Sequence, residues 1–520
     1  MPRSARGVPQ GSTINTEVAI VGAGPAGLTV ARGLRARGRK VLVLEAGGTE
    51  MGTDDDVGVV DAPKGTYDLR RSHFRGVGGC SPAWYTTGWK ARPLDPEDFE
   101  ARAHVADSGW PFSLESLRSD FEEAQTICEL GPLRYDGAEW VEVREERDLP
   151  GRPELEHPVF QLGPYGAFTR LAARLEAQEG FEILTEAKVV AVRHEGGERA
   201  ESLQVVGPGG SFQVRAQCYV LAAGGFDVPR LLLASGLGNE HDLVGRFFQE
   251  HLHSQGGHIE LTDPSAAHRL GGQLVAHDGT KLLCSVSLSR EVREREGLLG
   301  CVLWLAPVDE VEVSPTVRSL WAFRSRWRVD RRLPEQWPAR LAVMGRSPRP
   351  LLRKLAIKAG LRSPRWVSTI SFESECEPRR DSRVVLNGER DAQGMPKATL
   401  EWRLGNKDLW SVRASQLTIG RILEKSGYGR LVQPFGDETP PVHVGGGAHH
   451  MGTARMHHRP EDGVVNPSGR LHRCANVYVA GSSVFPTSGS SNPTLTLVAL
   501  AHRLSGHLDG AMESPSVGPS

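Results

Sequence analysis

Residues 16–48 have the sequence TEVAIVGAGPAGLTVARGLRARGRKVLVLEAGG. The run EVAIV is short, apolar and β-branched, which predicts a buried parallel strand, and KVLVLEA predicts a second one. Between them lie a GxGxxG pattern, formed by Gly22, Gly24 and Gly27, and a stretch with helical apolar spacing. Glu45 ends the second strand. Strand, glycine turn, helix, strand and acid together form the full fingerprint of a dinucleotide-binding βαβ unit.

Each residue of this fingerprint has a physical task. Gly22 permits the tight turn, Gly24 lets the backbone approach a pyrophosphate, and Gly27 allows close packing of helix on strand. The unpaired N–H groups of the helix N-terminus favour the negative charge of the pyrophosphate. The carboxylate of Glu45 accepts hydrogen bonds from a ribose diol and repels a 2′-phosphate, which disfavours an NADP-type ligand. The motif alone does not separate NAD from FAD.

Length, charge and cysteine usage narrow the class of protein. A chain of 520 residues predicts two domains, or one with large insertions. The formal charge of -1 gives no overall field for nucleic acid or an anionic membrane, and no window predicts a membrane span. The seven cysteines are dispersed without a CxxC pair, so we expect reduced thiols, a cytoplasmic location and no metal site. We expect disordered tails at 1–13 and 511–520.

Two later segments resemble further parts of a nucleotide-binding sheet. Residues 217–236 pass from a buried strand through two glycines into an apolar helix. Residues 474–508 contain the strand NVYVAGS and a helix with Pro493 in its first turn and Asn492 at its N-cap. The first domain is therefore predicted to combine N-terminal, middle and C-terminal pieces.

The region 256–436 has a different pattern. Residues 298–308, 318–329, 366–377 and 382–404 predict strands with hairpin-like breaks, and hence a mainly antiparallel sheet. The Arg- and Pro-rich segment 333–366 contains one amphipathic helix at 350–361. We interpret this segment as a solvated basic face, with a lid or an oligomer contact as alternatives. The oligomeric state is left open.

The predicted fold is therefore α/β, or α+β overall. It combines a Rossmann-like cofactor domain, built from discontinuous segments, with a substrate domain. We assign 14–105, 165–255 and 437–510 to the first domain, and 106–164 and 256–436 to the second.

The stretch GGGAHHMGTARM, residues 445–456, contains candidate catalytic residues. Histidine is the side chain that most readily exchanges a proton near neutral pH, and two of them, His449 and His450, stand side by side here. In an extended segment adjacent side chains point to opposite faces, so both are not expected to face one ligand. The spacing does not choose between them.

Several separated motifs, in this order, resemble the glucose–methanol–choline (GMC) oxidoreductase family. They are VGAGPAG…LEAG, RGVGGCS, VLAAGGFDVPRLLLASG, LVGRFFQEH, EPRRDSRVVLN and HHMGTARM…VYVAGSSVFPTSGSSNPTLTLVALAHRL. The resemblance covers nearly the whole chain. It implies bound FAD and the oxidation of an alcohol by hydride transfer to flavin N5.

The resemblance also implies the catalytic pair. His449 is the first residue of the family's H-x-x-G-T pattern, and Asn492 occupies the position of the family's second active-site residue. His449 would take the alcohol proton, and Asn492 would donate to the developing alkoxide. We expect His450 to be a packing or hydrogen-bonded histidine. Because a His–Asn pair occurs in family members acting on sugars, choline or sterols, it does not fix the substrate.

The fingerprint and the resemblance together give a predicted cofactor-binding set. We expect the FAD to be non-covalent, because the loop CSPAWYTT contains no histidine and has Ala83 near the family's attachment position. His73 precedes the glycines and is an unfavourable attachment point. The predicted set is Gly22, Gly24, Gly27, Glu45, Gly78, Gly79, Ser81, Val189, Ala223, Gly224, Gly481, Ser482, Pro493 and Thr494.

The expected function is FAD-dependent oxidation of a sugar, aminosugar or polyol, with oxygen or another electron acceptor. A hydroxynitrile-lyase-like enzyme with a structural flavin and a non-catalytic flavoprotein are the alternatives. Tryptophans that stack well on sugar rings are expected near the site. Glu373 and Glu375 offer counter-charges for a cationic substrate, although we favour a surface position for both. The tryptophans in question are Trp84, Trp89, Trp304 and Trp321.

Overall fold

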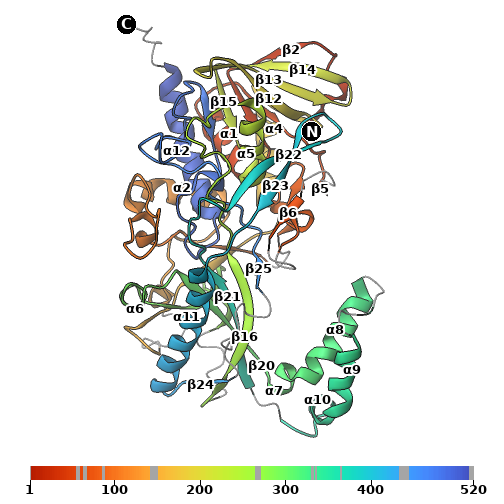
Figure 1. The fold of residues 1–520 in the computed structure, drawn as a ribbon, viewed down its shortest axis with the longest axis vertical. Coiled ribbons are helices and arrows are strands. Elements are labelled where there is room, and N and C mark those ends of the chain that lie inside the picture. The colour runs from red at the N-terminus through yellow and green to blue at the C-terminus, as the bar shows by residue number, and fades with distance from the viewer. Residues whose placement is uncertain are drawn as a thin grey trace.

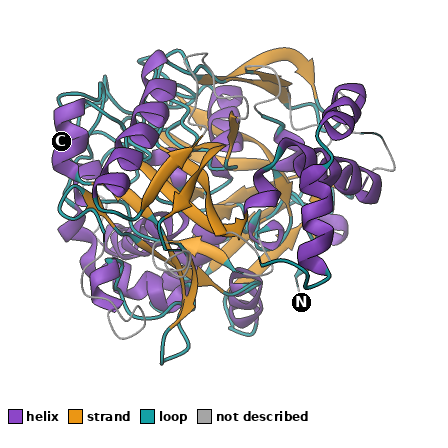
Figure 2. Cartoon of the chain, turned by 90° about the horizontal axis from the view of Figure 1, so that it is seen from below, coloured by secondary structure: helices purple, strands orange, loops and turns teal. Residues whose placement is uncertain are grey.

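The computed structural model describes residues 2–53, 59–62, 67–84, 88–140, 150–263, 271–329, 333, 337–363, 366–432 and 444–513. Figure 1 shows two main parts, one above the other, and a group of helices that projects from the lower part. In the perpendicular view of Figure 2, strands fill the middle of the molecule and helices lie around them.

A six-stranded parallel sheet forms the centre of the upper part. Its strand order is β1–β11–β4–β3–β15–β26, with every neighbouring pair parallel. The four strands β3, β4, β15 and β26 are buried along their whole length, as their continuous apolar runs require. The strands are β1 (Arg3–Ser4), β3 (Val18–Val21), β4 (Val41–Leu44), β11 (Phe181–Thr185), β15 (Cys218–Leu221) and β26 (Val477–Val479).

Helices from distant parts of the sequence pack around this sheet. Helix α1 contacts both α4 and α12, and α12 also packs on α2. The predicted βαβ unit and the predicted C-terminal strand–helix pair are thus confirmed as neighbours. The helices are α1 (Pro25–Arg35), α2 (Arg118–Ile127), α4 (Ala167–Glu176), α5 (Gly224–Ser235) and α12 (Thr494–Glu513).

The prediction of a disordered N-terminal tail is wrong. Strand β1 extends the parallel sheet beside β11, and β2 (Thr13–Asn15) pairs with β14 (Gly210–Arg215). Ala5 and Val8 are buried between these pairings. Backbone pairing on sheet edges orders a polar segment that has no amphipathic pattern of its own. At the other end, α12 continues to Glu513, and residues 514–520 lie outside the described residues.

The lower part is built on a seven-stranded antiparallel sheet. Its order is β24–β16–β21–β20–β19–β9, and β25 also pairs with β16. Helix α11 (Asn406–Lys425) packs on this sheet, and α6 (Arg290–Glu296) follows its strand β19. The predicted antiparallel sheet is confirmed. Its strands are β9 (Leu155–Glu156), β16 (Leu252–Leu261), β19 (Val286–Leu288), β20 (Cys301–Asp309), β21 (Trp366–Ser374), β24 (Gly429–Val432) and β25 (Val444–Gly446).

Four smaller sheets complete the described part of the fold. One contains β8 (Trp89–Ala91), β10 (Val159–Gly163), β17 (Gly272–Val275) and β18 (Lys281–Cys284), and β12 (Lys188–Glu195) and β13 (Arg199–Gly207) join β14 and β2. The predicted hairpin forms β22 (Arg383–Arg390) and β23 (Pro396–Glu401), and β23 also pairs with β6 (Val59–Asp61). The remaining pair is β5 (Gly52–Thr53) with β7 (Phe74–Arg75).

The hairpin β22–β23 belongs spatially with the upper part. Both of its strands pack on α5, and the buried guanidinium of Arg230 donates to the backbone oxygen of Pro396 (2.7 Å) and to Asp391 (2.6 Å). The sequence position of this hairpin predicts the substrate domain, but its packing on α5 places it beside the parallel sheet. The other proposed domain boundaries remain predictions.

Residues 318–329 form no strand, contrary to the prediction. They belong to α8 (Pro315–Val329), which packs with α7 (Glu310–Val313) and α9 (Trp337–Arg346), while α10 (Arg349–Lys358) packs on α7 and α8. The aromatic residues of this stretch favour strands in isolation, but packing between helices overrides that preference. The predicted amphipathic helix at 350–361 corresponds to α10.

Candidate active site

A cleft of about 1130 Å³ lies at the carboxyl ends of the parallel strands. Residues that follow β3, β4, β15 and β26 line it, which is where open α/β sheets bind ligands. Nine members of the predicted cofactor-binding set contribute to its lining. They are Gly22, Gly24, Glu45, Gly79, Val189, Ala223, Gly224, Gly481 and Ser482.

The start of α1 fits a pyrophosphate. No side chain caps this helix, whose N-cap residue is Gly24. A Cβ atom on Gly24 would meet only the Cα atom of Gly79, at 3.8 Å, so a side chain there would project into the cleft. Glycine is therefore needed at this position for the space above the backbone, and the free N–H groups of the helix can bind an anion.

Glu45 occupies the position of the acid that binds a ribose. Its buried carboxylate accepts hydrogen bonds from the backbone N–H groups of Ala23 (2.9 Å), Gly47 (2.8 Å) and Gly76 (3.0 Å). Burial raises the pKa of this carboxyl, and the three N–H groups oppose that rise. These contacts fix the carboxylate at the edge of the cleft, and the residues present fit FAD.

The other five predicted cofactor residues do not line the cleft. A Cβ on Gly27 would come within 2.1 Å of the backbone oxygen of Gly22, so Gly27 permits the packing of α1 on β3. Gly78 has φ +96°, and the hydroxyl of Ser81 donates to its oxygen at 2.7 Å, which holds the loop in shape. Pro493 and Thr494 stand at the start of α12, and their cofactor contact remains a prediction.

The two adjacent histidines face different surroundings. His450 lines the cleft, and its Nε2 atom hydrogen-bonds to the hydroxyl of Tyr67. The ring of Phe248 lies 5.8 Å from that of His450. Burial lowers the pKa of His450 to about 3, so its imidazole is neutral at ordinary pH. His450 is thus packed and hydrogen-bonded, as expected, and that it takes no part in proton removal remains a prediction.

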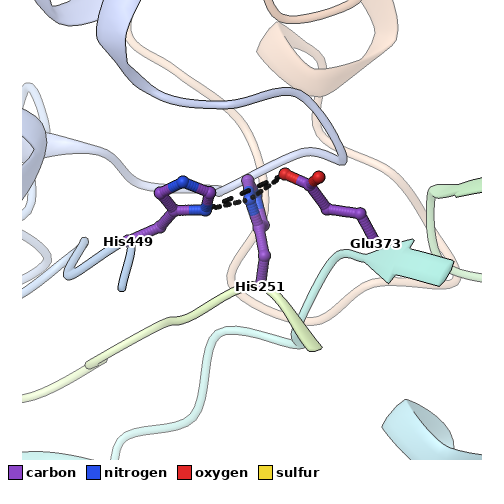
Figure 3. Close-up of side chains that lie close together, drawn as sticks. All are labelled: His251, Glu373 and His449. Carbon is purple, nitrogen blue, oxygen red and sulfur yellow. Dashed lines mark hydrogen bonds and ion pairs between the residues drawn. The ribbon is translucent and has the colours of Figure 1, made fainter. Parts of the chain in front are cut away.

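His449 contacts a separate group of polar side chains. Its Nε2 atom lies 3.1 Å from Nδ2 of Asn492, and its Nδ1 atom lies 2.9 Å from Nδ1 of His251. The Nε2 atom of His251 lies 3.4 Å from the backbone oxygen of Ser488. Figure 3 shows His449 and His251 meeting beside Glu373. The structure therefore brings the two predicted catalytic residues, His449 and Asn492, together.

One choice of tautomers satisfies these hydrogen bonds. With the proton of His251 on Nε2, which donates to the oxygen of Ser488, its Nδ1 accepts. In this assignment Nδ1 of His449 donates to His251, which leaves Nε2 of His449 without a proton. That nitrogen accepts from the amide of Asn492 and has the form that a general base requires.

Adjacent strands of the antiparallel sheet bring these residues together. Strand β16 lies between β25 and β21, so His251, just before β16, lies near both the segment that leads from β25 to His449 and Glu373 on β21. The buried carboxylate of Glu250 accepts from the backbone N–H groups of His449 and His251, each at 2.8 Å. One acid thus fixes the main chain of both histidines.

Glu373 supplies a buried negative charge behind the two imidazoles. Its Oε1 atom lies 3.4 Å from Nδ1 of His251 and 3.8 Å from Nδ1 of His449. Lys90 contacts its other oxygen, and His253 lies 3.7 Å from that oxygen. Burial alone would raise the pKa of Glu373, but Lys90 and the two nearby histidines hold that pKa well below its usual value.

The pKa of His449 is also strongly shifted. Burial lowers it well below the usual value, and His251, His253 and Lys90 act in the same direction, while Glu373 opposes them. His449 is therefore neutral before reaction, and the charge it gains on taking a proton would lie next to the carboxylate of Glu373.

Three predictions about this region are wrong. Glu373 and Glu375 are fully buried, because Lys90 and Arg102 respectively pair with them. Asn492 is not an N-cap: α12 starts at Thr494, and Oδ1 of Asn492 is buried without a hydrogen bond to any described residue. A capping side chain would accept through that oxygen.

Only one of the four tryptophans lies close to the histidine cluster. The ammonium of Lys90, which contacts Glu373, sits 4.4 Å from the ring centroid of Trp304. Trp84 and Trp89 pack together, with ring centroids 5.3 Å apart. Trp321 belongs to α8, where it donates to Glu312 at 2.7 Å, so its predicted place near the site is wrong.

His251, Glu373 and His449 also have the composition of a metal site, with ligand atoms within 4.8 Å of one another. However, Lys90 already compensates the charge of Glu373, and a hydrogen bond joins the two imidazoles. We therefore interpret the cluster as a network that holds protons.

Sequence reasoning assigned no role to His251, Glu250 or Lys90. His251 and Glu250 stand in the motif LVGRFFQEH, but the motif itself indicates no role for either residue. Their positions depend on the pairing of β16 with β21 and β25, for which the sequence carries no local pattern.

Comparison with known proteins agrees with this geometry. A model described as "FAD dependent oxidoreductase" matches residues 17–253, and one described as "GMC oxidoreductase" matches residues 378–501. The chain is 23% identical to the fructose dehydrogenase large subunit of Gluconobacter japonicus, over 94% of this chain and 97% of that protein. It is 24% identical to a C-glycoside 3-oxidase of Arthrobacter globiformis, over 76% and 68% respectively.

A solved structure supports the fold. The chain resembles pyridoxine 4-oxidase from Mesorbium loti with a TM-score of 0.54 and 19% identity, covering 95% of this chain and 99% of that one.

In the described part of the chain, no helix combines the length and the apolar character needed to cross a bilayer. In the sequence the two matched ranges lie before and after Glu373, and the first contains His251 while the second contains His449 and Asn492. The chain belongs to the GMC oxidoreductases and is an FAD-dependent enzyme that oxidises alcohols.

Proposed function

We propose that this enzyme oxidises an alcohol group of a neutral sugar or polyol, with His449 as the general base and Asn492 as the partner of the alcohol oxygen. The observation that carries the proposal is the contact between Nε2 of His449 and Nδ2 of Asn492. It places an unprotonated nitrogen beside an amide donor. When bound, FAD supplies the acceptor for the hydride.

His449 removes the hydroxyl proton at Nε2. An alcohol gives up a hydride easily only as its O–H proton leaves, and a positioned base contributes on the order of 10²–10⁴ in rate. The lowered pKa keeps His449 neutral and ready to accept. After the transfer, Glu373 faces the charged imidazolium across 3.8 Å.

Asn492 binds the alcohol oxygen. One hydrogen of its Nδ2 points to His449, so the other can donate to the developing alkoxide. Its Oδ1 atom, buried without a hydrogen bond to the described residues, can accept from a second hydroxyl of the substrate. A molecule with neighbouring hydroxyl groups would satisfy both.

The substrate class rests on the relatives and on charge. Two relatives that match most of this chain are named for fructose and for C-glycosides. Glu373 and Glu375 offer no free counter-charge for an aminosugar, because Lys90 pairs with Glu373 and Arg102 with Glu375. We therefore favour a neutral ring or polyol over a cationic aminosugar. Oxygen or another acceptor would complete the cycle.

We also propose that the FAD is not covalently attached. His73 lines the cleft, but its Nε2 atom is engaged by Asp227 at 2.9 Å. Cys80 lines the cleft as well, and burial raises its pKa, which keeps the thiol protonated. The seven cysteines are dispersed along the sequence without a CxxC pair, and on that basis we propose a cytoplasmic location.

Anaerobic flavin reduction tests the proposal. A panel of neutral sugars, polyols, aminosugars, benzyl alcohol and a sterol is mixed with the purified holoenzyme, and flavin bleaching is followed. We expect the neutral sugars and polyols to reduce the flavin fastest. A clear preference for benzyl alcohol or the sterol would refute the substrate class, and faster reduction by aminosugars would refute the charge argument. Acid precipitation should release the yellow colour, and colour left on the protein would show covalent attachment.

A further inference from the structure

The projecting helices have an unusual surface. We call residues 315–366, which include α8, α9 and α10, the arm. Figure 1 shows these helices projecting to one side of the lower part. Of the thirteen large hydrophobic side chains that are exposed among the described residues, nine belong to the arm: Leu320, Trp321, Leu333, Trp337, Leu341, Leu352, Leu355, Leu361 and Trp366. A tenth of the sequence thus holds most of the exposed large hydrophobic side chains of the described residues.

The arm also concentrates positive charge. Its sequence contains fourteen Arg and Lys residues and two acidic residues, whereas the whole chain has a formal charge of -1. Within 337–363 the charged side chains are all basic. The net charge of the whole chain is near zero although this segment is strongly basic. The segment can therefore attract anions even though the whole chain has no overall positive field.

Basic and apolar side chains are exposed together on α10 and in the turn that follows it. Leu352 and Leu355 are 63% and 62% exposed, Arg349 and Lys358 are exposed on the same helix, and Arg362 is exposed in the turn after it. Arg353 and Lys354 point elsewhere and pair with Glu310 and Glu312 of α7, which attaches α10 to the lower part. Neither α9 nor α10 has a buried residue. These helices thus bury little on their own chain.

A second copy of this chain is a poor partner for the arm. Two arms would repel each other, since each carries a large excess of one charge. Outside the arm, the exposed large hydrophobic residues among those described are Met51, Tyr165, Val275 and Trp410, which lie on separate elements. They offer no apolar face complementary to the arm.

We propose that the arm binds the surface of an anionic lipid bilayer. In this arrangement the exposed leucines and tryptophans enter the boundary between headgroups and acyl chains, and the flanking Arg and Lys contact lipid phosphates. Each basic residue near such a surface contributes on the order of 1 kcal/mol, and buried apolar area adds to it. In this arrangement the enzyme lies on the membrane surface.

Co-sedimentation with vesicles tests this proposal. The purified holoenzyme is mixed with phosphatidylcholine vesicles, with or without phosphatidylglycerol, at low and high salt. We expect sedimentation with the anionic vesicles at low salt, little with the neutral ones, and release by salt. The triple variant Arg349→Gln, Lys358→Gln, Arg362→Gln should reduce the partition coefficient roughly 100-fold, at about 1 kcal/mol per charge.

The apolar contribution is tested separately, with a matched control. Leu352→Ser with Leu355→Ser should weaken binding roughly tenfold or more. Val275→Ser is the control, since Val275 is equally exposed at 63% but lies on β17 outside the arm. FAD content and substrate-dependent flavin reduction report that each variant is folded.

Three outcomes would overturn the proposal. One is a failure of the wild type to bind anionic vesicles at low salt. Another is unchanged binding by the double Ser variant, which would show charge attraction without insertion. The third is reversible self-association that the double Ser variant abolishes, because a second copy would then cover the face. None of these results depends on the substrate or on the roles of His449 and Asn492.

Discussion

His449 and His450 are consecutive residues, and their rings contact two different regions of the molecule. The ring of His450 faces the FAD cleft, where it meets Tyr67 and Phe248. The ring of His449 faces the antiparallel sheet, where it meets Asn492 and His251. Burial is the largest cause of the lowered pKa of both imidazoles, and a carboxylate opposes it in each case: Glu373, 3.8 Å away, at His449 and Asp227 at His450.

This difference shows how one short segment can serve two parts of an enzyme. Successive side chains point to opposite faces, so the segment carries one histidine toward the cofactor region and one toward the buried acid. Histidine suits both positions because it is neutral when buried without a charged partner. Substitutions on the two sides should therefore have separable effects, on cofactor retention in one case and on proton removal in the other.

The largest effect is expected on the cleft side, for Gly24→Val. The new side chain would occupy the space proposed for the pyrophosphate, while a Cβ there meets no protein atom closer than 3.8 Å. The protein should fold but purify without FAD, measured by its absorbance spectrum and by circular dichroism. Gly388→Val on β22 is the control, since a Cβ there meets nothing within 4 Å and lies outside the cleft. A yellow Gly24→Val protein would contradict the placement of the cofactor.

On the other side, His449→Ala should keep FAD but lose proton removal. We expect the rate of flavin reduction by alcohol to fall by roughly two to four orders of magnitude. Anaerobic stopped-flow measurement gives this rate directly, and His457→Ala, in the same loop, is the control. In the wild type the rate should fall as His449 becomes protonated, so the lowered pKa places the acid limb below pH 6.5. An acid limb above that value would contradict the environment described for His449.

His251→Phe should weaken the same step by removing the partner that orients His449. We expect roughly a 10- to 100-fold loss, the range seen when a partner that orients a functional imidazole is removed. Since His251 lowers the pKa of His449, its removal should also move the acid limb of the pH–rate profile to higher pH. The same substitution at His258, a buried histidine on β16, should change neither the rate nor the pH profile. A lower rate with an unshifted profile would mean that His251 only packs.

Asn492→Asp tests the alkoxide partner. A carboxylate cannot donate a hydrogen bond and repels an alkoxide, so the reduction rate should fall by roughly 10²-fold, comparable to the loss of an oxyanion donor. Asn492→Ala separates this role from capping. Because Oδ1 of Asn492 makes no bond to α12, its removal should not cost the roughly 1 kcal/mol of a lost cap. Denaturant unfolding measures the free energy of unfolding of this variant. A loss of stability without a loss of rate would show that Asn492 caps α12 after all.

The parts of this site that follow local patterns could be predicted from the sequence. The GxGxxG turn, Glu45 and the strand before α5 are formed by neighbouring residues, and the resemblance placed His449 and Asn492. Long-range pairing could not be predicted in the same way. A glutamate at position 373 is compatible with an exposed strand as well as with a buried one. Its burial depends on the ammonium of Lys90, which comes from a strand distant in the sequence.

The same reasoning explains two misplaced segments. Residues 3–15 have no amphipathic period, and they are ordered by strand pairing with β11 and β14. Residues 318–329 have the aromatic content of a strand, yet helix packing within the arm determines their structure. In both cases the deciding contacts come from residues far away in the sequence.

The smallest effect is expected for His450→Phe. Phenylalanine preserves the ring that packs near Phe248 and Tyr67 and removes only the hydrogen bond to the Tyr67 hydroxyl. One neutral hydrogen bond contributes about 1 kcal/mol, so FAD affinity or the reduction rate should change by roughly fivefold at most. The pH–rate profile should be unchanged, because a pKa of about 3 keeps His450 neutral across the range where the enzyme is measured. Titration of FAD into apoprotein and stopped-flow reduction check both values. If His450→Phe abolished reduction with FAD still bound while His449→Ala did not, His450 would be the base, and the roles given to the two sides of this segment would have to be exchanged.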